Sequence, residues 1–134
     1  MKMFNGFLDL GALSLAQITG GSRDVRMLGL RIDGNARGNQ AAARWELQNS
    51  VRSYSTRGII RDMTIVDSQS EGILVGGDDS VVENTVISGA GGNGIHLSGG
   101  RRIRILNNII SDTNLAGDRV GHVGGNITFS RKAP

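Results

Sequence analysis

A repeat of about 22 residues in the middle of the chain constrains its fold more than any other feature. Ile65, Ile87 and Ile110 recur at nearly equal intervals, and the Gly-Ile dipeptides that begin at Gly72 and Gly94 repeat at the same interval. A fixed period of roughly 20–25 residues is typical of a solenoid, in which each repeat buries its apolar face only against its neighbours. The sequence therefore predicts stacked coils.

The coils are predicted to be made of short strands. Each repeat holds short runs of β-branched apolar residues broken by Gly, Asn and Asp, with nothing of helical length between them. The Leu-x-x-Leu-x-Leu signature of leucine-rich repeats is absent, and a hexapeptide coil needs a shorter period. With 21 glycines, one proline and 4% aromatic residues, the composition suits tight bends around a thin aliphatic core. We expect an all-β fold, a parallel β-helix of about four to five coils with three short strands per coil.

The repeat also divides the chain. Residues 1–22 are predicted to form a first strand or a cap, residues 23–130 the β-helix, and residues 131–134 a basic tail. Ile127 and Phe129 predict one further strand, with Phe129 covering the open end of the core. No run approaches the ~20 apolar residues of a membrane span. A net charge of +3 without cysteine indicates neither a nucleic-acid partner nor a cysteine-based metal site.

One column of polar residues falls at equivalent bends. Asp62, Asn84 and Asn107 follow one another at the same interval as the isoleucines. Side chains of this type hydrogen-bond nearby backbone groups. We interpret the three as a structural ladder that bonds the backbone of neighbouring coils.

A second column is predicted on the outside of the strands that follow each Gly-Ile. If Ile73 and Ile95 face the core, then Leu74 and His96 face outward and stack about 4.8 Å apart. Glu46, in Trp45–Leu47, is predicted to take the same outward position one coil earlier, and His122 one coil later. Of these residues, His96 is the candidate for general acid–base chemistry.

Charged residues follow two of these strands at equivalent bends. Asp78 and Asp79 precede Arg101 and Arg102 by one coil. Such a group could bind an acidic sugar, and the two carboxylates are candidate Ca²⁺ ligands, the one cofactor that the residues suggest. The structural alternative is a solvated turn in which Asp79 pairs with Arg101 between coils.

The polar stretch 38–57 is longer than the later repeats and carries the only Trp and the only Tyr. Insertions in a solenoid commonly form loops on a binding face. Trp45 favours a packing role, whereas Tyr54 is the better candidate for contact with a ligand. Outside this stretch, Val86 and Ile109 are outward and apolar on adjacent coils, which suggests a subunit contact.

Residues 29–35, Gly-Leu-Arg-Ile-Asp-Gly-Asn, are followed by coils with Asn84-Thr85 and Asn107-Asn108 at one bend. This pattern resembles the right-handed parallel β-helix proteins of the pectate-lyase-like superfamily over about residues 23–115. That group includes pectin and alginate lyases, polygalacturonases, mannuronan epimerases and phage tailspike depolymerases. The resemblance implies a polysaccharide partner on the outward face of the first sheet. It also implies an extracellular or virion-surface location and a homo-oligomer, such as a trimer.

The catalytic motifs of two of these groups are not intact. Polygalacturonases carry Asp-Asp at the start of a strand and Gly-His-Gly on the next coil. Here Asp78-Asp79 follows the strand, and Asn93 stands where the histidine would be. The epimerase motif Tyr-Gly-Phe-Asp-Pro-His corresponds to residues 71–76, which lack its Tyr, Asp and His. Two functions remain open: a β-helix that binds an acidic polysaccharide and cleaves or epimerises it, or a non-catalytic structural or receptor-binding segment like a tailspike shaft.

Overall fold

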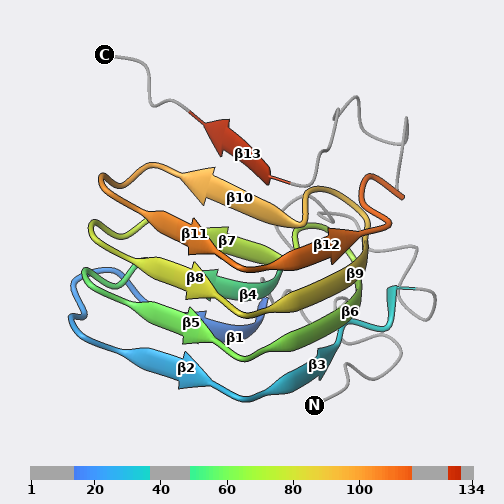
Figure 1. Ribbon diagram of the computed structural model, residues 1–134, viewed down its shortest axis with the longest axis horizontal. Coiled ribbons are helices and arrows are strands. Elements are labelled where there is room, and N and C mark those ends of the chain that lie inside the picture. The colour runs from blue at the N-terminus through green and yellow to red at the C-terminus, as the bar shows by residue number, and fades with distance from the viewer. Residues whose placement is uncertain (1–13, 37–48, 116–126, 131–134) are drawn as a thin grey trace.

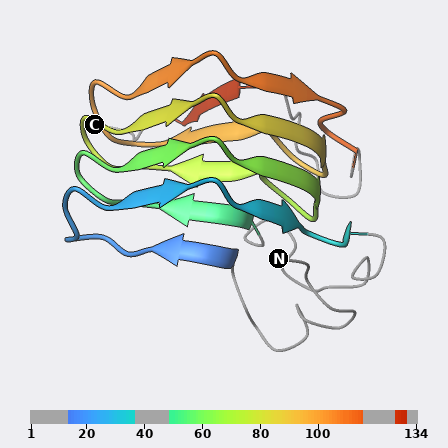
Figure 2. The ribbon, with the colours of Figure 1, turned by 60° about the horizontal axis from the view of Figure 1, so that its bottom comes forward.

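A computed structural model describes residues 14–36, 49–115 and 127–130. These residues wind into stacked coils, and each complete coil contributes one strand to each of three parallel sheets (Figure 1). Figure 2 shows the same stack from a second side, with the chain rising from the blue first coil to the orange last one. The parallel β-helix predicted from the sequence repeat is confirmed.

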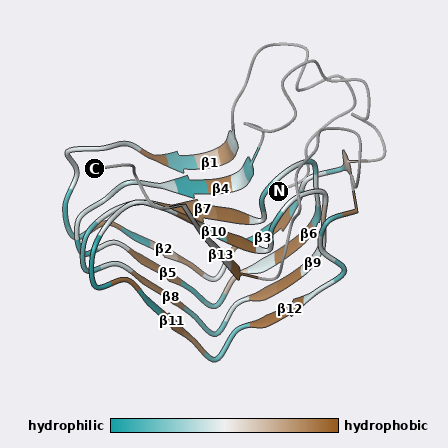
Figure 3. Ribbon diagram, turned by 90° about the horizontal axis from the view of Figure 1, so that it is seen from above, coloured by the Kyte–Doolittle hydropathy of each residue, from teal (hydrophilic) through white to brown (hydrophobic). Residues whose placement is uncertain are grey.

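Consecutive coils add neighbouring strands to each sheet. The first sheet holds β1 (Ser14–Ile18), β4 (Asn49–Ser53), β7 (Ile73–Val75), β10 (Ile95–Ser98) and β13 (Ile127–Ser130). The second holds β2 (Arg26–Leu28), β5 (Ile59–Arg61), β8 (Val81–Glu83) and β11 (Arg104–Leu106). The third holds β3 (Arg31–Asp33), β6 (Thr64–Ser68), β9 (Val86–Ala90) and β12 (Ile109–Ser111). Viewed along the stack, the sheets form three sides of a prism (Figure 3).

The core consists of columns of aliphatic side chains inside this prism. Ile65 pairs in register with Ile87, and Ile87 with Ile110, as their spacing predicts. Ile65 and Ile87 are fully buried, whereas Ile110 is only partly buried because β12 forms an edge of its sheet. Each buried aliphatic side chain contributes roughly 1.5–3 kcal/mol of transfer free energy. These columns therefore hold successive coils together.

The bend between the second and third sheets differs from the prediction in one respect. Asp62, Asn84 and Asn107 do stack there, each with a positive φ between 50° and 56°. Their side chains are exposed, however, and the backbone N–H groups of Asp62 and Asn84 donate to carbonyls of the following coil. Asn and Asp tolerate the left-handed conformation better than other side chains do. Their place in the bend is therefore set by backbone conformation.

The side-chain hydrogen bonds at this bend are made by Thr85 and Asn108, the residues that follow Asn84 and Asn107. The Asn108 Oδ1 accepts a hydrogen bond from the Thr85 backbone N–H at 2.9 Å, and its Nδ2 donates to the Val82 carbonyl at 2.9 Å. The Thr85 hydroxyl accepts from the Met63 N–H at 3.4 Å. These bonds satisfy buried backbone groups of the preceding coil. Side chains at this bend do hydrogen-bond the backbone of a neighbouring coil, as predicted, but Thr85 and Asn108 make these bonds in place of Asn84 and Asn107.

Two predicted strand positions are also wrong. Val51–Ser53, not Trp45–Leu47, pairs with Ile73–Val75, so Arg52 takes the outward position assigned to Glu46. Thr128, not His122, pairs with His96. Trp45, Glu46 and His122 lie outside the described residues. Both errors have one cause: a long segment precedes the strand, and the regular spacing does not carry across it.

The first sheet supplies a strand at each end of its order, β1 at one end and β13 at the other. β1 pairs with β4, so the first strand of the solenoid lies within residues 1–22. β13, which begins at Ile127, is the further strand that the sequence predicts, and it pairs with β10 so that Ile127 lies beside Ile95. No helix in the part of the chain that the structure describes is long and apolar enough to cross a membrane.

Candidate functional site

The outward face of the first sheet carries one row of side chains from successive coils. Gln17, Arg52, Leu74 and His96 pair in register across β1, β4, β7 and β10. Leu74 and His96 are neighbours, as their spacing predicts, but Leu74 is only 8% exposed. Neighbouring strands lie about 4.8 Å apart, so Arg52 and His96 are about 10 Å apart along the stack. The polar side chains of Arg52 and His96 therefore lie at separate positions along the stack of coils.

Arg52, the cationic residue of this row, was not singled out from the sequence. Its guanidinium carbon lies 5.3 Å from the centre of the Tyr54 ring, and its Nη2 donates to the Tyr54 hydroxyl at 3.4 Å. Its Nε is buried without a hydrogen-bond partner. Within the described ranges, no carboxylate pairs with Arg52. Among the described residues, this cation lies against an aromatic ring without an acidic partner.

Tyr54 keeps its place because a glycine lies beside it on the next coil. A Cβ added to Gly76 would come within 2.6 Å of two Tyr54 ring carbons. The ring therefore lies close to the backbone of the coil above it. Tyr54 and Arg52 come from adjacent outward positions of β4 and the bend that follows it. Together they form a platform whose components are a flat ring and a guanidinium.

His96 is held by a buried carboxylate that the sequence did not reveal either. The Glu71 side chain is 3% exposed, and its Oε1 lies 3.3 Å from the His96 Nδ1. Its Oε2 accepts from the Asn93 backbone N–H at 2.6 Å, and its Oε1 accepts from the Asn93 Nδ2 at 3.1 Å. A signal was present: Glu71 and Asn93 each precede a Gly-Ile dipeptide, at the same spacing as the core isoleucines.

This contact orients the imidazole. A carboxylate facing one ring nitrogen favours the tautomer that carries its proton there, and it fixes the direction of the ring. The His96 side chain keeps 17% of its surface exposed on the outward face. His96 is therefore a histidine with a defined orientation at a solvent-accessible surface, the arrangement that acid–base chemistry requires.

The two aspartates and two arginines at the bend between the first and second sheets pair with each other. Asp79 accepts from Arg102 at 2.6 and 2.8 Å, and Asp78 accepts from Arg101 at 3.2 and 3.4 Å. The predicted pair between Asp79 and Arg101 is wrong by one residue. The hydrogen bonds that Arg102 donates to Asp79 lower the pKa of Asp79 below its usual value and raise the pKa of Arg102. These carboxylates are therefore committed to arginines.

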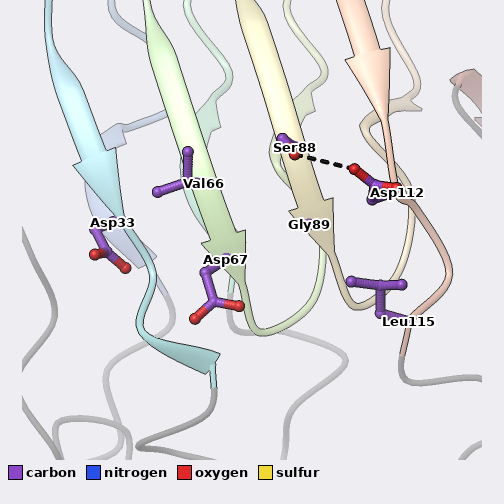
Figure 4. A pocket seen from close by; sticks show the side chains of 7 residues that line it. All are labelled: Asp33, Val66, Asp67, Ser88, Gly89, Asp112 and Leu115. Carbon is purple, nitrogen blue, oxygen red and sulfur yellow. Dashed lines mark hydrogen bonds between the residues drawn. The ribbon is translucent and has the colours of Figure 1, made fainter.

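A third group of carboxylates lines a pocket of about 510 Å³ at the far ends of the third-sheet strands (Figure 4). Asp33, Asp67 and Asp112 come from different coils, and Asp112 accepts a hydrogen bond from the Ser88 hydroxyl at 3.2 Å. Among the residues that the structure describes, no three His, Asp or Glu side chains are grouped closely enough to hold a metal ion. Asp78 and Asp79 therefore belong to no such group of three among these residues.

Short parallel strands stacked coil upon coil, with side-chain rows on three flat outer faces, define a parallel β-helix protein. The family model described as a right-handed beta helix region matches residues 49–133. The chain belongs to this family. No curated protein and no solved structure gives a significant match to it.

Proposed function

We propose that this protein binds an acidic polysaccharide along the outward face of the first sheet. The observation that carries the proposal is Arg52, whose guanidinium lies against the Tyr54 ring with no carboxylate paired to it among the described residues. An arginine with free donors recognises a planar carboxylate through two parallel hydrogen bonds. A uronic acid supplies that group on every sugar ring.

The neighbouring groups suit the rest of a sugar chain. The Tyr54 ring offers a flat apolar surface with a hydroxyl at its edge, and such side chains combine packing with hydrogen bonding. Gln17 and His96 lie on the same outward row, one strand before and two strands after Arg52. Ligand groups bound at successive strands are spaced along the stack. An extended polymer that runs along the coil axis meets all of them.

The oriented histidine favours a second candidate activity on the same face, the cleavage or epimerisation of a uronic acid. Eliminative cleavage and epimerisation both begin when a base removes the proton from the carbon that bears the carboxylate. Elimination then expels the glycosidic oxygen on the neighbouring carbon, whereas epimerisation returns a proton to the opposite face. Neutralising that carboxylate makes the proton more acidic, which is the role that a guanidinium such as Arg52 can take. His96, fixed by Glu71 at 3.3 Å, is the candidate base.

The binding proposal is tested with the full chain by calorimetric titration against oligomers of galacturonic acid and of alginate. Neutral dextran oligomers of similar length serve as the ligand control. Hydrogen bonds to a charged group contribute about 1.5–3 kcal/mol, so Arg52→Ala is expected to weaken binding at least about tenfold. Arg23→Ala removes the same charge from an exposed bend and is the matched control. Equal affinity of the two variants, or equal binding of dextran, would overturn the proposal.

The catalytic candidate is tested separately by following the ultraviolet absorbance of unsaturated products and the uronic acid composition of the recovered polymer. Loss of turnover in His96→Ala with binding retained supports His96 as the base. Full activity of that variant removes the residue from the mechanism. Binding without turnover leaves a carbohydrate-binding module, and absence of binding favours a structural or receptor-binding segment.

A further inference from the structure

The outer face of the second sheet carries a groove that the first-sheet site does not use. Its volume is about 450 Å³, and it is lined by Asp24, Arg26, Arg57, Ile59, Asp79, Val81 and Arg104. The bend residues Asp24, Arg57 and Asp79 form one wall, and the outward row of strand residues forms the floor. Arg26, Ile59, Val81 and Arg104 form that outward row, because they pair in register from β2 to β11. The groove therefore runs along the coil axis, across the strands.

Both acidic residues of the groove are neutralised within the protein. Asp24 accepts from Arg57 at 2.7 and 2.6 Å, and Asp79 is bonded to Arg102 on the following coil. The hydrogen bond from Arg57 lowers the pKa of Asp24, so this carboxylate stays ionised and paired at neutral pH. The bend wall is thus a column of alternating charges, Asp24, Arg57, Asp79 and Arg102, whose signs cancel.

Arg26 and Arg104 are not neutralised in this way. Within residues 14–36, 49–115 and 127–130, neither guanidinium has a hydrogen-bond or ion-pair partner, and both side chains are exposed. They stand on the first and fourth coils, three strand spacings or about 14 Å apart. Between them the groove floor is apolar, with Ile59 partly exposed and Val81 7% exposed. The groove presents a cation, an apolar centre and a second cation in a line.

We propose that this groove binds an extended acidic peptide segment of a partner protein. In an extended chain, residues i, i+2 and i+4 point to the same side, and residues i and i+4 are about 13–14 Å apart. An acidic residue at i, an apolar one at i+2 and an acidic one at i+4 therefore match Arg26, the Ile59 and Val81 floor, and Arg104. A polysaccharide fits less well, since its hydroxyl groups would meet this apolar floor and polar side chains already bonded to one another.

The probe is the peptide acetyl-Ser-Glu-Thr-Val-Thr-Glu-Ser-amide, added to the isotope-labelled full chain and followed by NMR. Its control, acetyl-Ser-Glu-Thr-Val-Glu-Thr-Ser-amide, has the same composition with the acidic residues at i and i+3. Binding is expected to shift the backbone amides of β5 and β8. Exposed ion pairs of this kind change affinity by up to about fivefold each, so Arg26→Ala and Arg104→Ala are each expected to weaken binding by about that factor.

Two matched variants separate this groove from other cationic surfaces. Arg23→Ala removes a charge from an exposed bend, and Arg52→Ala removes one from the first sheet; both are expected to leave peptide affinity unchanged. The proposal is overturned if the two peptides bind equally, if Arg23→Ala weakens binding as much as Arg26→Ala, or if no amide shifts at millimolar peptide. It is also overturned if an acidic oligosaccharide shifts the β5 and β8 amides more strongly than the peptide.

Discussion

Replacing Glu71 by alanine is expected to destabilise the protein by about 2–4 kcal/mol. The buried carboxylate accepts the Asn93 backbone N–H at 2.6 Å and the Asn93 Nδ2 at 3.1 Å, and it contacts His96. A buried donor that loses its acceptor costs about 1–3 kcal/mol, which gives about 2–6 kcal/mol for the two Asn93 donors. Removing the carboxylate also relieves its own desolvation, so the net value lies in the lower half of that range.

The assay is urea unfolding of the full chain followed by circular dichroism, with the free energy taken from the midpoint and slope. Glu83→Ala is the matched control, because Glu83 makes one ion pair with Arg61 at 3.4 Å and is partly exposed. Exposed pairs contribute about 1 kcal/mol or less. Glu71→Gln keeps one acceptor oxygen and is expected to fall between the two. A Glu71→Ala variant no less stable than Glu83→Ala would refute the view that this carboxylate holds the coils together.

Three further predictions concern the effect of substitutions on the stability of the fold. Gly77→Ala places a Cβ 1.9 Å from the Ser55 carbonyl oxygen, so the coils must separate, and we expect a loss of about 3 kcal/mol or more by urea unfolding. Ile87→Ala, at a 1% exposed position, should cost about 2–5 kcal/mol, whereas Ile109→Ala, at a 66% exposed one, should change stability by less than about 0.5 kcal/mol. Because its arginine partner lowers the folded-state pKa of Asp79, this carboxylate stabilises the fold above the unfolded pKa of 3.8 and loses that effect as pH falls through the lower folded value. Acid titration of Asp79→Asn should accordingly show a smaller loss of stability below about pH 4 than the unsubstituted protein.

The aliphatic columns could be predicted because they depend only on spacing. Ile65 and Ile87 are one period apart and become direct partners, since the coils in this part of the chain have the same length. The first pair of coils breaks this rule, because Ile32 pairs with Ile65 across a much longer stretch of sequence. β4, the strand that follows this longer stretch, also has a weak apolar pattern. One of its inward positions holds the buried Ser53, where later coils hold Val75 and Leu97.

The charged residues were harder to place for two physical reasons. The chain takes seven steps from Leu97 to Arg104 but six between their partners Val75 and Val81. The extra residue lies at a bend where Gly99 and Gly100 have positive φ. This residue shifts the partners of Asp78 and Asp79 by one position. Glu71 was missed because an ionised side chain is expected at the surface unless it is paired. The partners of Glu71, Asn93 and His96, lie on the next coil. The only sign of them in the sequence is that Glu71 and Asn93 are separated by the same number of residues as the core isoleucines.

The distribution of charge over the coils explains why two faces, and not the bends, are the candidate binding surfaces. At the bend between the first and second sheets, Asp24 and Asp79 each bind an arginine on the next coil, which cancels the charge there. Arg26, Arg52 and Arg104 stand instead on strands, where parallel pairing places only Gln, Leu, Ile or Val beside them. The two faces have the same sign of charge but different surroundings. A tyrosine ring and an oriented histidine accompany Arg52, whereas an apolar floor separates Arg26 from Arg104. The surroundings, more than the charge, are therefore the reason why we propose a sugar acid for the first sheet and an acidic peptide for the second.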